Sequence, residues 1–160
     1  RDGRPTVTDS VLPHTRVDLV SYSAWDTQHD PALLRSALDY IAKRTPDREP
    51  FGDRNVFIGE FGLPENDYPL PRVQQTVQGT MKTALDWGCP YVVFWQLYCN
   101  EARHHPVETN RHVRGFWLIR PDGTKAWAWR ELREILTSGR LQPAERQPEP
   151  LVPSVPSRGP

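Results

Sequence analysis

Glu60 is the side chain whose type and position best suit a catalytic role. It directly follows the apolar stretch 56–59 (VFIG). A carboxylate is out of character there, because Glu is almost never buried without a partner. Held at the end of a strand, it can act as a nucleophile or exchange a proton with a ligand. Position alone leaves a second interpretation open, in which Glu60 forms a structural salt bridge at the rim of the fold.

Aromatic and acidic residues accompany the two neighbouring apolar stretches. Trp25 closes residues 17–25 (VDLVSYSAW), Trp95 lies within residues 91–98 (YVVFWQLY), and Glu101 follows them. Trp95 is the best candidate for stacking against a ring-shaped ligand, since an inward-facing indole presents a large apolar surface. Its alternative role is packing in the core. Glu101 is a candidate contact to substrate.

Three alternating strand–helix units must position these side chains. The pattern predicts strands over 17–25, 55–61 and 91–98, and helices from Asp30-Pro31 to before Pro46, over 71–87 and over 125–136. Such alternation indicates an α/β fold with parallel strands and right-handed crossovers. An open dinucleotide-binding sheet would show a glycine-rich turn after a strand, which residues 59–62 (GEFG) do not match. A partial (β/α)₈ barrel, also called a TIM barrel, fits better, and its reactive residues would gather at the C-terminal ends of the strands.

The chain divides into a barrel-like part over 1–140 and a Pro-rich tail or linker over 141–160. The start, RDGRP, has neither an initiator Met nor the apolar region of a signal peptide. We therefore expect a preceding segment to be missing, and the cellular compartment is not predicted.

Composition excludes several classes of partner. The 20 basic and 20 acidic side chains give a formal net charge of +0, which indicates neither nucleic acid nor an anionic membrane surface as partner. No apolar run approaches the ~20 residues of a membrane span. Neither a metal nor another cofactor is expected, because no standard zinc spacing joins the polar residues His104, His105, Glu108 and His112.

Four segments resemble the cellulase-like clan of glycoside hydrolases, which are (β/α)₈ barrels. Residues 55–62 (NVFIGEFG) look like the strand that ends in the clan's catalytic nucleophile. Residues 92–98 (VVFWQLY) resemble the eighth strand, whose Trp lines the sugar subsite, and residues 17–26 resemble the sixth. Residues 115–127 look like the closing segment before the last helix. The resemblance implies about the last three β/α units of a retaining enzyme, with Glu60 as nucleophile and Trp95 beside the sugar.

The sixth strand departs from the clan pattern. The clan commonly carries a His-x-aromatic pair there, usually with Tyr, which hydrogen-bonds the nucleophile; Ser23 and Trp25 stand at the aligned positions. Trp25, and Tyr22 next to Ser23, are candidate substrate contacts. Period-2 alternation points Tyr22 to the face opposite Ser23 and Trp25.

The general acid is the larger difference. In the clan it is a Glu after an Asn at the end of the fourth strand, and this chain begins after that strand. Retaining hydrolysis needs two carboxyl groups ~5–5.5 Å apart. Asp26 and Glu65, like Glu101, lie near predicted strand ends. Each suits a solvated loop or a substrate contact better than the role of the acid.

The implied function is hydrolysis of O-glycosidic bonds in β-linked glycans by the intact parent, through a retaining double displacement. The partner is then a carbohydrate substrate, and the chain alone is expected to be inactive. Two alternatives stay open. One is a non-catalytic carbohydrate-binding barrel, and the other is a small α/β interaction domain in which Glu60 is structural.

Overall fold

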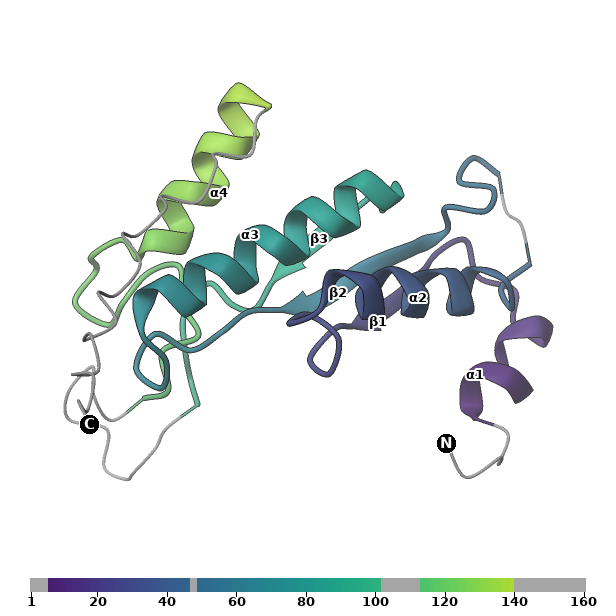
Figure 1. Cartoon of the computed structure of the whole chain (residues 1–160), viewed down its shortest axis with the longest axis horizontal. Helices are drawn as coiled ribbons and strands as arrows, with labels where there is room; N and C mark the ends of the chain where they lie inside the picture. The colour runs from purple at the N-terminus through teal and green to yellow at the C-terminus, as the bar shows by residue number, and fades with distance from the viewer. Residues whose placement is uncertain (1–5, 47–48, 102–112, 140–160) are drawn as a thin grey trace, which may run out of the picture.

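The computed structural model describes residues 6–46, 49–101 and 113–139. Figure 1 shows the elements, which in chain order are α1 (Val7–Ser10), η1 (Leu12–His14), β1 (Val20–Ser23), α2 (Pro31–Ala42), β2 (Val56–Phe61), α3 (Leu70–Trp87), β3 (Val92–Phe94) and α4 (Trp127–Ser138). None of the helices in these ranges combines the length and apolar character that crossing a membrane requires.

The three strands form one parallel sheet in the order β1-β2-β3. The α/β class and the predicted order of neighbouring parallel strands are therefore confirmed. β3 is shorter than the predicted 91–98, because the chain leaves the sheet after Trp95. The Trp95 N–H still donates to the Phe61 carbonyl at 2.8 Å, whereas the carbonyl of Leu97 accepts from the N–H of Ile119 at 3.0 Å.

Helices α2 and α3 lie side by side over the same face of the sheet (Figure 1). The Asp30 carboxylate caps α2 by accepting from the N–H groups of Ala32 and Leu33, as the Asp-Pro pair predicts. Gly88, with φ of 100°, ends α3 in the left-handed conformation that favours glycine. The core between helices and sheet is mostly aliphatic, with Leu34, Leu38, Val56, Ile58, Val73 and Val77 each at most 1% exposed.

The other face of the sheet is open. Ser21, Ser23 and Val93 alternate to this side and are exposed, and Phe57 and Gly59 are only half-buried. Parallel sheets are normally covered on both faces. Here α2 and α3 cover only one of them.

A β-bulge interrupts β2 just before its end. Ile58 pairs with Tyr22 and Glu60 with Ser23, so one residue of β2 has no counterpart on β1. The pairing with β3 shows the same extra residue between Ile58 and Phe61. Both of these residues are fully buried in the core under the helices. Strict alternation from Ile58 would send Glu60 to the helix side, and the bulge instead turns it toward the end of the sheet.

The N-terminal helix α1 is fastened to α2 through Asp9. The Tyr40 hydroxyl donates to the Asp9 carboxylate at 2.6 Å, and the Arg44 guanidinium forms an ion pair with the same oxygen. Asp9 also closes a capping box with Thr6. These contacts hold the pKa of Asp9 well below its ordinary value, with the hydrogen bond from Tyr40 as the largest cause.

Candidate active site

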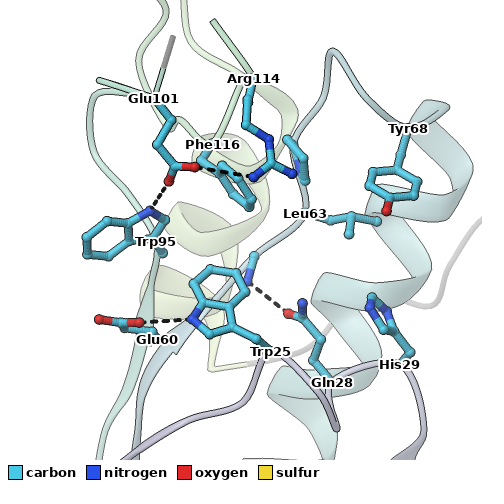
Figure 2. Close-up of a pocket in the computed structure, with 12 residues that line it drawn as sticks. Trp25, Gln28, His29, Glu60, Leu63, Tyr68, Trp95, Glu101, Arg114 and Phe116 are labelled. Carbon is cyan, nitrogen blue, oxygen red and sulfur yellow. Dashed lines mark hydrogen bonds and ion pairs between the residues drawn. The ribbon is translucent and has the colours of Figure 1, made fainter. Parts of the chain in front are cut away.

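A pocket of about 450 Å³ lies at the C-terminal ends of the strands. Its lining comes from the segments after β1, β2 and β3 and from the stretch before α4 (Figure 2): Trp25, Gln28, His29, Glu60, Gly62, Leu63, Pro64, Tyr68, Trp95, Glu101, Arg114 and Phe116. Glu60 and Trp95 therefore meet in one cavity, as the positions at strand ends predict. Trp25 and Glu101 join them there.

Trp25 holds the Glu60 carboxylate. Its indole Nε1–H donates to Glu60 Oε2 at 2.9 Å (Figure 2). An indole N–H is a donor only, so this contact anchors one oxygen of the carboxylate. Within the described part of the chain, Oε1 has no hydrogen-bond partner. The carboxylate thus has one anchored oxygen and one unengaged oxygen, an arrangement suited to nucleophilic attack.

Glu101 holds the Trp95 side chain. The Trp95 indole Nε1–H donates to Glu101 Oε1 at 2.9 Å, and Arg114 Nη1 pairs with Glu101 Oε2 at 3.4 Å. The Arg114 Nε–H also donates to Asp67 Oδ2 at 2.9 Å. The loop carrying Asp67 and the segment carrying Arg114 therefore both brace the anchor of Trp95.

Phe116 connects the two tryptophan sites. Its ring meets the Trp25 ring edge-on at 5.6 Å between centroids, and the Arg114 guanidinium lies 5.0 Å from the Phe116 centroid. Continuous contacts therefore run from Glu60 through Trp25, Phe116, Arg114 and Glu101 to Trp95. The aromatic walls of the pocket are consequently positioned as one assembly.

Gln28 ties the pocket to α3. Its side chain is 5% exposed and accepts the Gly62 N–H at 3.0 Å, while its backbone carbonyl accepts the Thr80 hydroxyl at 3.1 Å. This bond fixes the backbone two residues after Glu60. At Gly62 itself a Cβ would lie 2.6 Å from the Trp95 carbonyl oxygen, so glycine permits the close approach of the two strand ends.

The wall away from Glu60 consists of His29, Leu63 and Tyr68 (Figure 2). Partial burial lowers the pKa of His29, and the charge of Arg72 lowers it further. Tyr68 remains 43% exposed although it lines the cavity. This wall combines an apolar side chain with two groups that can donate and accept hydrogen bonds.

Three of the sequence candidates do not line this pocket. The Tyr22 hydroxyl donates to Asp26 at 3.1 Å, and both residues line a separate cavity between β1 and α2. Glu65 accepts from the Trp117 indole at 2.8 Å and forms an ion pair with Arg120 at 2.7 Å, so it has a structural role. Of Asp26, Glu65 and Glu101, only Glu101 shares the cavity of Glu60.

Several residues of the pocket are not predicted from the sequence. Arg114 and Phe116 lie 54 or more residues beyond Glu60 and reach it only through the fold. Gln28, His29 and Tyr68 belong to loops without a periodic pattern. The one available signal was their place just after predicted strands. The candidate metal residues 104–112 lie outside the described residues, and no group of metal ligands occurs within the ranges that the structure describes.

Comparisons with protein-family models, with curated proteins and with solved structures found no match. The geometry of the pocket therefore carries the functional argument.

Proposed function

We propose that the complete protein hydrolyses O-glycosidic bonds of β-linked glycans by a retaining double displacement, with Glu60 as the nucleophile. One observation carries the proposal. Glu60 lies between two tryptophans at the C-terminal edge of a parallel sheet, with one carboxylate oxygen anchored by Trp25 and the other unengaged by described residues. Aromatic faces suit the apolar faces of sugar rings, and the carboxylate suits attack at the anomeric carbon.

We further propose that this chain supplies about the last three β/α units of a (β/α)₈ barrel. The parallel order of β1, β2 and β3 supports this, as does the gathering of Glu60 and Trp95 at the C-terminal strand ends. The open sheet face, with Val93 47% exposed, is then the side that faces the barrel interior.

In the proposed reaction, Oε1 of Glu60 attacks the anomeric carbon while the bond to the leaving oxygen breaks. An acid elsewhere in the protein gives that oxygen a proton, and a glycosyl ester forms on Glu60. Water then attacks the same carbon and gives a proton to the residue that acted as the acid, and the ester bond to Glu60 breaks. Two inversions give net retention of configuration.

Glu101 is unsuited to be that acid. Its Oε1 accepts from Trp95 and its Oε2 pairs with Arg114, so both oxygens face fixed donors rather than a leaving group. Asp26 and Glu65 lie outside the pocket. The acid therefore belongs to residues beyond the described ones, and such a group typically contributes ~10²–10⁴-fold to the rate.

The test uses substrates that need no acid. A dinitrophenyl 2-deoxy-2-fluoro-β-glycoside has a leaving group that departs as a stable phenolate, so Glu60 alone can form the ester. We expect mass spectrometry to find one glycosyl group on the peptide that carries Glu60, and none in Glu60→Gln. Glu101→Gln should still be labelled. The absence of label across gluco-, manno- and galacto-configured reagents would contradict the proposal.

A non-catalytic sugar-binding barrel is the second candidate. It is favoured by the same pocket, because the described residues supply aromatic walls and no second unengaged carboxylate there. The labelling experiment separates the two functions. Sugar binding without any ester on Glu60 would favour the binding barrel.

A further inference from the structure

The pocket wall opposite Glu60, formed by His29, Leu63 and Tyr68, can contact a ligand. It takes no part in the reaction just described. Figure 2 shows Tyr68 and His29 across the pocket from Glu60 and Trp95. The Tyr68 hydroxyl is directed to the side on which His29 lies, and Leu63 lies between Tyr68 and the centre of the pocket. A ring bound at Glu60 and Trp95 leaves this wall uncovered.

The cavity is larger than one sugar ring. At roughly 30 Å³ per water, its 450 Å³ correspond to about fifteen waters. A pyranose with its hydroxyls has about twelve non-hydrogen atoms, each occupying less volume than a water because covalent bonds draw the atoms together. One ring therefore leaves space for part of a second.

The loop that carries Tyr68 is held by hydrogen bonds to the segment 113–115. The backbone N–H groups of Glu65 and Asn66 each donate at 3.1 Å to carbonyls of Gly115 and Arg114, and the Tyr68 N–H donates to Pro64 at 3.2 Å. The Asn66 side chain donates to the Val113 carbonyl at 2.7 Å. An exposed tyrosine on an anchored loop presents its ring at little cost in conformational entropy.

The polar groups of this wall suit an uncharged, hydroxyl-rich ligand. The tyrosine hydroxyl can donate and accept, and an uncharged imidazole offers one donor and one acceptor. The pKa of His29 is lowered, first by partial burial and then by the charge of Arg72, and this favours the uncharged ring. Sugar hydroxyls, which are both donors and acceptors, match this set.

We propose that His29, Leu63 and Tyr68 form a second sugar subsite, so that the pocket takes an uncharged glycan of at least two rings. The first ring lies at Glu60 and Trp95, and the second stacks on Tyr68. This inference rests on the proposed function, because the position of the first ring is set by Glu60.

The experiment is an NMR titration of the whole chain with cellobiose, β-1,4-mannobiose and β-1,4-galactobiose, each beside its methyl β-monoglycoside. We expect at least one disaccharide to bind about tenfold more tightly than its monoglycoside, a difference of about 1.4 kcal/mol. Tyr68→Ala should remove this advantage while changing monoglycoside affinity less than about twofold. Tyr68→Phe, which keeps the ring, should retain part of it.

Tyr91→Ala is the matched control, because Tyr91 is 54% exposed and lies outside the pocket. It should leave all affinities unchanged. The subsite is overturned when monoglycosides bind and disaccharides bind no better, or when Tyr68→Ala keeps the disaccharide advantage. A wild-type chain that binds none of the six sugars overturns the proposed function, and the subsite with it.

Discussion

Trp25 takes a role at the residue scale that the sequence suggested only in part. Alignment placed it where the resembling clan has a hydrogen-bonding aromatic residue, and the structure places its N–H 2.9 Å from Glu60. The alternation of residues along a strand put it on the same side as Ser23 and opposite Tyr22. In the structure β1 ends at Ser23, so Trp25 lies two residues beyond the strand, and alternation along the strand does not by itself set the direction of its side chain. Its partner 35 positions away depends on a register that the strand itself does not encode.

Replacing Trp25 with Phe should slow ester formation on Glu60 without unfolding the chain. The substitution keeps an aromatic ring against Phe116 and removes the only described donor to the carboxylate. We expect a loss of about 10–10²-fold in the labelling rate, below the ~10²–10³-fold cost of removing a donor that acts on the transition state directly. The measurement is the rate of adduct formation by mass spectrometry.

Trp87→Phe provides the control for this substitution. Trp87 is buried and donates its indole N–H to Asp39 at 2.8 Å, outside the pocket. Its loss should lower thermal stability and leave the labelling rate unchanged. Equal rates for the Trp25 variant and the wild type would show that Glu60 does not depend on this hydrogen bond.

At the scale of elements, the three helices that the sequence predicts agree with the structure more closely than the strands do, whereas α1 and η1 are not predicted. Caps at Asp30 and Gly88 are local chemistry, and both lie where the sequence places them. Strand ends depend on distant partners. β3 stops early because the chain after Trp95 pairs with residues 118–119, and nothing within 91–98 indicates that exchange. The bulge in β2 has the same origin, since it exists only relative to β1 and β3.

We expect opposite effects on stability from two Gly→Ala substitutions, one at the junction between β2 and β3 and one within α3. At Gly62 a Cβ would meet the Trp95 carbonyl at 2.6 Å, so the backbone must move apart. Gly62→Ala should therefore cost about 1–3 kcal/mol of folding free energy and reduce labelling of Glu60. Gly79 lies within α3, where an added Cβ would meet no atom within 4 Å apart from the neighbouring backbone of its own helix, so Gly79→Ala should stabilise by about 0.5–1 kcal/mol. Urea unfolding measures both changes, and a neutral Gly62→Ala would contradict this packing.

The attachment of α1 to α2 should be sensitive to acid. The lowered pKa of Asp9 means that its ionised form is favoured by folding, so its contribution is present above the ordinary value of 3.8 and is lost as pH falls below it. Asp9→Asn should lower stability near neutral pH, and its deficit relative to the wild type should shrink below pH 3.8. Asp53→Asn is the control, because that side chain is 77% exposed. A deficit independent of pH would mean that the Asp9 charge is not involved.

At the scale of the whole molecule, the sheet is asymmetric. One face is covered by α2 and α3, and on the other Val93 is exposed and Phe57 is only partly buried. The apolar runs of the sequence are typical of strands buried on both faces of a sheet, so they indicate that this open face is suited to burial as well. What the runs do not specify is which face remains open. That depends on where the crossover helices pack.

We expect the open face of the sheet to cause reversible self-association of the chain. Apolar strand surface that water contacts is stabilised by contact with a second such surface. Val93→Lys places a charge there, and because Val93 is 47% exposed the fold itself should change little in stability. We expect sedimentation velocity to show a concentration-dependent increase in mass for the wild type and a marked decrease of that effect in Val93→Lys. Val7→Lys adds the same charge to an apolar residue that is 76% exposed on α1, away from the sheet, so it should associate like the wild type. Equal behaviour of all three proteins would show that the open face is not the surface through which the chains associate.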